Sequence, residues 1–227
     1  MVHDCRMTIT KHPTDVSLKM AVDQELKWLP SINSTHIGVS VDYGIVTLDG
    51  QVDSYPEKFL AEKAALRVHG VSGVIGQIQV RNHWNAVSDS EIAAEANAAL
   101  DRAIDVPTGS VQLVVHDHVV TLSGSVNWHF QRKAAERSVS YLKGVTGLHN
   151  TVTITPEVAA VGLKKTIGKA LVRNAQLEGK GIAVSAEKSA VTLTGKVQTC
   201  AERHQAGMTA WSAPGVTAVA NQVTVGA

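Results

Sequence analysis

The chain has 227 residues, of which 44% are hydrophobic and 18% are charged, and its 21 basic and 20 acidic side chains nearly balance. No segment approaches the 18 or so apolar residues of a membrane span, and the start, MVHDCRMTITKHP, lacks the apolar core of a secretory signal. These features exclude a membrane-spanning chain and predict a soluble protein that stays in the cytoplasm as written.

The first predicted elements are a tail, a helix and a hairpin. Residues 1–14 form the N-terminal tail. A helix begins with Asp15 as its N-cap, and its apolar residues recur at helical spacing: Leu18, Val22, Leu26 and Leu29. Residues 37–41 alternate with period two, and Tyr43-Gly44 suits a tight turn with positive φ. The returning strand is VTLDGQV, residues 46–52.

A second helix and a third strand complete this unit. Gly50 is predicted to end the returning strand at a bend or a close backbone approach. Pro56 suits the first turn of the second helix, and Gly70 lies where its C-cap is expected. The last strand runs over residues 74–80. The order is therefore helix, strand, strand, helix, strand.

The same unit is written three times. VTLDGQV returns as VTLSGSV at 120–126 and as VTLTGKV at 191–197, and each copy is followed by a second glycine twenty residues after the first. The six glycines are Gly50 and Gly70, Gly124 and Gly144, and Gly195 and Gly215. Such a constant interval indicates an internal tandem repeat. We therefore predict an α+β protein with three αββαβ modules over residues 15–82, 88–156 and 157–227, each a three-stranded mixed sheet with two helices on one face.

The repeated phrase x-V-T-L-x-G-x-V, followed across a helix by G-V-x-x-V-x-N-x-[VI], resembles the BON domain, a family named for bacterial osmotically inducible and nodulation proteins. Residues 25–39, ELKWLPSINSTHIGV, are similar to the helix-to-strand junction of tandem-BON proteins. The resemblance covers Asp15 to Val225. It implies a non-enzymatic bacterial module that is associated with osmotic and envelope stress and, in several members, with phospholipid membranes. Many relatives are periplasmic, so the periplasm is the alternative location.

The third module differs from the others in charge. It has eight basic and four acidic side chains, whereas the first two modules are slightly acidic. Lys165, Lys169 and Arg173 recur every four residues and form one stripe on the predicted first helix, which Lys164 and Lys180 flank. Such a face can attract anionic lipid. An ordinary solvated face and, less favoured, phosphate contact with nucleic acid are the alternatives.

Other residues give weaker indications. Cys5 and Cys200 have neither a disulfide framework nor zinc spacing and are predicted to be free thiols. His116 and His118 fall in a hairpin turn that varies between copies, so no metal site is predicted. Ser123 and Ser125 have no indicated catalytic partners, and the sequence contains no G-x-S-x-G elbow and no Walker loop. We therefore predict no catalytic residues and no cofactor.

Tryptophan suits a membrane interface or a packed seam between modules. For Trp28, Trp84 and Trp128 we favour packing between modules.

The sequence thus predicts a stress-associated binding or adaptor protein that contacts an anionic phospholipid surface. The alternatives are a protein-interaction or chaperone-like role and a small-ligand or ion sensor. The sequence leaves the oligomeric state open.

Overall fold

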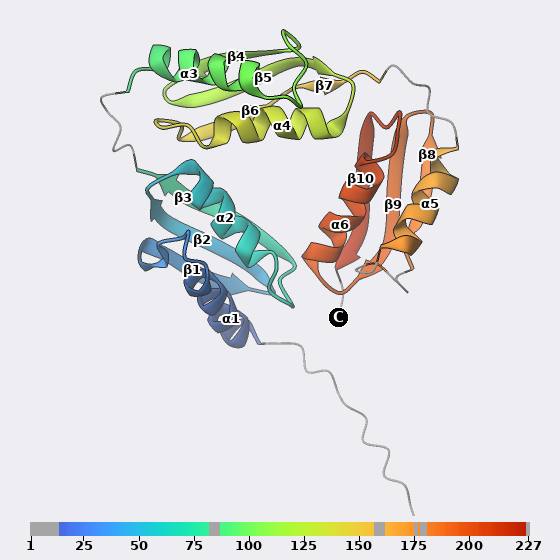
Figure 1. Cartoon of the computed structure of the whole chain (residues 1–227). Helices are drawn as coiled ribbons and strands as arrows, with labels where there is room; N and C mark the ends of the chain where they lie inside the picture. Colours follow the sequence, from blue (N-terminus) through green and yellow to red (C-terminus); the bar gives the residue numbers. More distant parts are fainter. Residues whose placement is uncertain (1–13, 82–86, 157–161, 175–176, 178–180, 226–227) are drawn as a thin grey trace, which may run out of the picture.

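The computed structural model of the chain describes residues 14–81, 87–156, 162–174, 177 and 181–225. It contains three αββαβ modules (Figure 1). Module 1 consists of α1 (Asp15–Trp28), a short 3-10 helix (Ser34–His36), β1 (Ile37–Asp42), β2 (Ile45–Val52), α2 (Tyr55–Ala65) and β3 (Gly73–Val80). Module 2 consists of α3 (Asp89–Arg102), β4 (Val111–His116), β5 (Val119–Val126), α4 (His129–Ser140), β6 (Gly147–Asn150) and β7 (Thr153–Ile154). Module 3 consists of α5 (Leu163–Arg173), β8 (Ala183–Glu187), β9 (Ala190–Val197), α6 (Cys200–Trp211) and β10 (Ala218–Val225).

The repeated phrase is the central strand of each sheet. In module 1, β2 pairs antiparallel with β1 and parallel with β3, and the order is β1-β2-β3. Module 3 has the same order, β8-β9-β10, while in module 2 the third strand is divided into β6 and β7, which both pair parallel with β5. The predicted mixed three-stranded sheets are therefore confirmed, with one interrupted edge strand in module 2.

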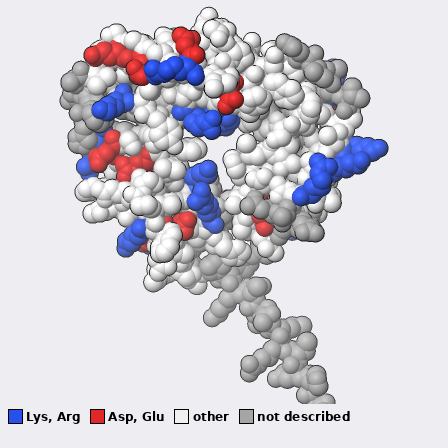
Figure 2. Space-filling view, viewed as in Figure 1, with Lys and Arg blue, Asp and Glu red and all other residues white. Residues whose placement is uncertain are grey.

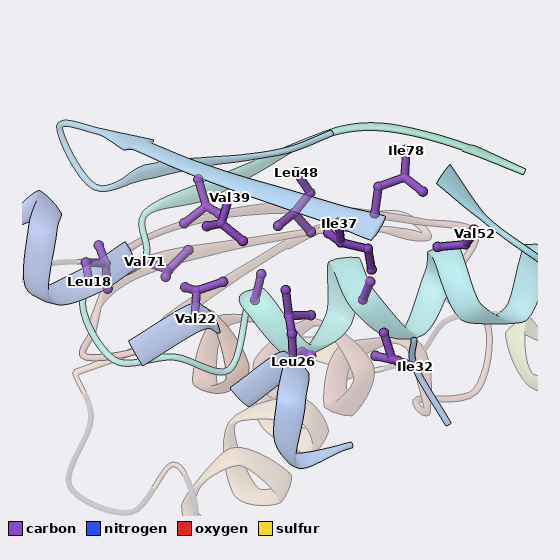
Figure 3. Packing of buried hydrophobic residues seen from close by; sticks show 14 residues of the cluster. Leu18, Val22, Leu26, Ile32, Ile37, Val39, Leu48, Val52, Val71 and Ile78 are labelled. Atoms are coloured by element: carbon purple, nitrogen blue, oxygen red, sulfur yellow. The ribbon is translucent and has the colours of Figure 1, made fainter. Parts of the chain in front are cut away.

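Each module has its own apolar core between one face of the sheet and the two helices. Leu48, Leu122 and Leu193 lie at equivalent positions of the central strands, and each is fully buried. Leu26, Leu100 and Leu171 lie at equivalent positions of the first helices and are also buried. Figure 3 shows the first core, with side chains of α1 and of the sheet directed toward one another.

Gly50, Gly124 and Gly195 lie inside the central strands, not at their ends as predicted. Their φ angles are 120°, 119° and 136°, and a Cβ on any of them would collide with a backbone carbonyl oxygen of the segment before the first strand. The carbonyls are those of His36, Ser110 and Gly181. The predicted close backbone approach is thus confirmed, and it explains why only glycine fits here.

The second set of glycines lies beyond the helix C-caps, so the predicted C-cap role is wrong. Helix α2 ends at Ala65 with Leu66 as its C-cap, four residues before Gly70. Gly70 has φ 92° and occupies the third position of a β-turn that the Val71 N–H closes onto the Val68 carbonyl. Gly144 and Gly215 have φ 88° and 83° in equivalent turns. A β-turn with positive φ at its third position requires glycine or asparagine, so the turn and not the helix end fixes these residues.

The hairpin turns adopt the predicted positive φ, and a carboxylate holds two of them. Thr14, not Asp15 as predicted, is the N-cap of α1. The carboxylate of Asp15 instead accepts hydrogen bonds from the backbone N–H groups of Tyr43 and Gly44, at 3.1 and 3.0 Å. Asp89 accepts two equivalent bonds in module 2, both of 3.0 Å. Helix and hairpin are thereby joined in both modules.

The three modules close into a circle through three different seams, and α2, α4 and α6 face its centre (Figure 1). Tyr55, His129 and Cys200 are equivalent first residues of these helices. Tyr55 packs against the core of module 2, the ring of His129 stacks on Trp211 of module 3, and the Cys200 thiol donates a 3.0 Å hydrogen bond to the Val71 carbonyl of module 1. Each module thus meets the next in a head-to-tail arrangement that closes.

Candidate functional site

Helix α5 has a buried apolar face and an exposed basic face. Leu163, Ile167 and Leu171 are buried and anchor the helix on the core of module 3. The opposite side carries Lys164, Lys165 and Lys169, with Arg173 at the C-terminal end, and all four side chains are exposed. These four residues are called the α5 basic face below. Lys180, the fifth residue of the predicted lipid site, lies outside the described residues.

The α5 basic face borders a shallow open groove against the β8–β9 hairpin. Gly168 and Val172 form its apolar floor, and Lys188 of the hairpin adds a fifth cation. Val172 is 76% exposed. None of the four helix cations has a carboxylate of the described residues within ion-pair distance. Lys and Arg atoms project from the molecule over α5 at the right-hand edge of Figure 2. The structure therefore brings four of the five predicted residues together in an uncompensated cationic surface.

This surface is specific to module 3. The equivalent residues of α3 are Ala93, Ala94, Ala98 and Arg102, and Arg102 donates a 3.0 Å bond to the Glu95 carboxylate. A basic stripe is thus no requirement of the fold, because the same helix forms in module 2 without it.

The second candidate region is the seam between modules 2 and 3. The rings of His129 and Trp211 stack with centroids 4.3 Å apart and an interplanar angle of 12°, and the Arg132 guanidinium lies 5.4 Å from the Trp211 ring centroid. His129 is 6% exposed, and its Nδ1 has no hydrogen-bond partner among the described residues. Desolvation, and then the charges of Arg132 and Lys133, lower the pKa of His129 to about 4. The ring is therefore neutral at pH 7.

The sequence does not predict this seam, because the residues that form it differ between the three copies. Packing between modules is predicted for Trp28, Trp84 and Trp128, but Trp28 is 82% exposed, so the prediction is wrong for Trp28. Trp84 lies outside the described residues. Trp128 is half-buried and lies near Phe130 of its own module. Trp211 occupies the seam instead. Its position at the end of a helix with an alanine-rich core face was the available signal.

The structure also locates the cysteines and histidines that the sequence analysis considers. Cys200 is a free, buried thiol whose pKa is raised by burial, and Cys5 lies outside the described residues. The Nδ1 of His118 lies 3.0 Å from the Gly144 carbonyl oxygen, and His116 lies 3.4 Å from Asp117. In the described part of the chain, no group of three or more His, Cys, Asp or Glu side chains could hold a metal ion.

Within the described ranges, no helix is long and apolar enough to span a bilayer.

Comparisons with known proteins agree with the repeat. The BON domain family matches residues 14–82, 88–156 and 161–227. The chain is 33% identical over 125 residues to osmotically-inducible protein Y of Escherichia coli (strain K12), a match that spans 53% of this chain and 62% of that protein. The chain thus matches less than two thirds of the length of this relative.

Two solved structures show weaker likeness. The C-terminal domain of CdsD, a structural protein of the type III secretion system of Chlamydia trachomatis, is 15% identical with a TM-score of 0.26 over 94% of this chain and all of that one. The PrgH periplasmic domain is 9% identical with a TM-score of 0.21 over 84% of this chain and 95% of that one. Scores this low carry no argument about function. The family match covers nearly the whole chain in three copies that coincide with three αββαβ modules, and the chain belongs to the BON domain family.

Proposed function

We propose that this BON protein is a non-enzymatic, stress-associated binding protein that docks on anionic phospholipid membranes through the α5 basic face. The observation that carries the proposal is the set of four exposed cations on one 11-residue helix with no carboxylate partner among the described residues. The similarity to an osmotically inducible protein supports the stress association. Cytoplasm and periplasm both border a membrane, so the proposal does not depend on the compartment.

The charge is sufficient for peripheral binding. A basic residue near an anionic surface contributes about 1 kcal/mol, so four contribute about 4 kcal/mol before losses to screening. Val172 is exposed beside them and can enter the lipid headgroup region.

Flotation of the purified chain with vesicles tests the proposal. We expect binding to vesicles that contain phosphatidylglycerol, little binding to pure phosphatidylcholine, and loss of binding as salt is raised. Lys165→Glu with Lys169→Glu should weaken binding by at least about 30-fold, because two attractive contributions of about 1 kcal/mol each are lost and two negative charges are added. Lys19→Glu with Lys27→Glu on α1 is the matched control, because it changes the net charge equally on another exposed helix. Equal binding by both double variants would refute the proposed contact.

A protein-interaction role is the second candidate. Helix α1 exposes three large apolar side chains, Val16, Met20 and Trp28, at 71%, 59% and 82%. Such residues on an outer helix can contact a partner protein. Indifference to lipid together with loss of a partner on Trp28→Ser would favour this role.

A further inference from the structure

A half-enclosed cleft of about 1040 Å³ lies between module 1 and module 3. Helix α2 forms one wall, and α5 and α6 form the other. The walls carry partly or fully exposed apolar side chains from both modules: Phe59, Leu66, Met208 and Pro214. The Phe59 side chain is 47% exposed, although aromatic side chains of this size are usually buried in a core. The volume lies just above the roughly 300–1,000 Å³ that is typical of small-molecule sites.

The rim of the cleft is cationic. Lys63 in the last turn of α2, Arg67 in the turn that follows this helix, and Arg173 at the end of α5 line it. Glu62 is the one carboxylate among the described lining residues, and desolvation by burial raises its pKa. Desolvation by burial lowers the pKa of His204 on α6, and the charges of Lys63 and Lys133 lower it further. In Figure 2, Lys and Arg atoms from separate modules face the hollow between them.

The shape of the cleft and its charge select the kind of ligand. An apolar floor with a cationic rim complements a molecule with a hydrocarbon chain and an anionic head. The cleft lies on the inner side of the circle of modules, between helices that face one another (Figure 1). We infer that this cleft binds a single-chain amphiphile with an anionic head group, with the head at Lys63 and Arg67 and the chain against Phe59, Leu66 and Met208.

This site is distinct from the membrane contact. On α5, Thr166, Ile167 and Ala170 line the cleft, whereas Lys164, Lys165 and Lys169 face the outer groove. Only Arg173 among the helix cations borders both. The two sites can therefore be tested separately, provided that Arg173 is left unchanged.

Titration calorimetry with three probes below their aggregation limits tests the inference. Decyl phosphate should bind in a 1:1 ratio, and both decanol, which lacks the charge, and inorganic phosphate, which lacks the chain, should bind at least about tenfold more weakly. Decanoate and a lysophosphatidylglycerol then distinguish a fatty acid from a lysophospholipid as the source of the head group. Equal affinity for decyl phosphate and decanol, or binding of many molecules per chain, would overturn the inference.

Variants locate the site. Lys63→Gln with Arg67→Gln should weaken binding of decyl phosphate by about tenfold or more, since each charged hydrogen bond contributes strongly to affinity. Thr166→Trp should block the cleft from an exposed position. Lys19→Gln with Lys27→Gln on α1 is the matched control. Lys165→Glu with Lys169→Glu should leave decyl phosphate binding unchanged while it weakens vesicle flotation. Unaltered affinity in both cleft variants would show that the ligand binds elsewhere.

Discussion

The seam between modules 2 and 3 should weaken as the pH falls, because closure buries a neutral His129. The pKa of this ring is about 4 in the closed structure, against 6.5 for the ordinary side chain. The closed form therefore binds fewer protons than the open form below pH 6.5. Its stability is complete above that pH and falls as the pH drops toward 4. The linkage relation gives a loss of about 2 kcal/mol between pH 7.5 and pH 5.

His129→Phe isolates this effect, since phenylalanine keeps the stack on Trp211 but cannot titrate. The variant also removes the buried Nδ1 that lacks a partner among the described residues, so at pH 7.5 it should be at least as stable as the natural chain. The charged groups that influence His129 are Arg132, Lys133 and Glu136, and all three remain in the variant. Any pH dependence that arises from them or from other histidines is therefore common to both proteins.

Urea unfolding at pH 7.5 and pH 5, followed by circular dichroism and by Trp fluorescence, provides the measurement. We expect the natural chain to lose about 2 kcal/mol more than His129→Phe over this interval. Because three modules can unfold separately, the Trp211 contribution to fluorescence identifies the transition that belongs to the seam. The same pH slope in both proteins would refute the reasoning, because the buried imidazole would then carry no linkage.

Two further predictions concern backbone fit and the thiol. Gly124→Ala should destabilise module 2 by at least about 3 kcal/mol, because it adds a collision with the Ser110 carbonyl to an unfavourable φ. Gly109→Ala meets no atom within 4 Å and should cost only about 1 kcal/mol. Thermal unfolding that ranks the two variants equally would contradict the close approach. In a Cys5→Ser background, Cys200 should react with a disulfide reagent about 100-fold more slowly in the folded chain than in denaturant, since it is buried and its thiol pKa is raised. Rapid reaction of the folded protein would show that the seam to module 1 is open.

The fold could be predicted because the residues that repeat are those that build each module. Leu48, Leu122 and Leu193 are identical in the three copies since each fills the same core site. The repeated glycines could be identified for the same reason, but their exact structural roles could not be predicted. A sequence shows that Gly50 lacks a side chain, while only the structure shows the His36 carbonyl that occupies the space.

One repeated side chain has a role that spacing could not show. Asn150 donates from its amide to the Arg132 carbonyl oxygen at 3.1 Å and accepts from the Val152 N–H at 3.2 Å. Asn221 makes equivalent contacts in module 3, at 2.7 and 3.3 Å. The second helix is thus tied to the third strand through an asparagine. The sequence pattern shows that the asparagine is shared between copies. It does not show the hydrogen-bond acceptor, which is a backbone carbonyl eighteen residues away.

The candidate sites could be predicted only in part. The α5 basic face was visible because its cations follow the helical period within one element. The cleft was not, since its walls come from residues more than one hundred positions apart, such as Phe59 and Met208. The seams were hidden for another reason. The residues that form the seams differ between copies, and an alignment of the copies reveals only the residues that they share.

Those differences are what a closed circle of non-identical modules requires. Three identical modules with identical seams could close on themselves or add further copies without limit, because every end would fit every other end. Here Tyr55 meets an apolar core, His129 meets an indole and Cys200 meets a backbone carbonyl. Each seam is chemically distinct, and a module placed beside the wrong neighbour would lose the stack or bury a polar group without its partner. The first position of the second helix therefore makes a different contact in each module, while Glu57, Gln131 and Glu202 at the third position all accept backbone hydrogen bonds at the helix start.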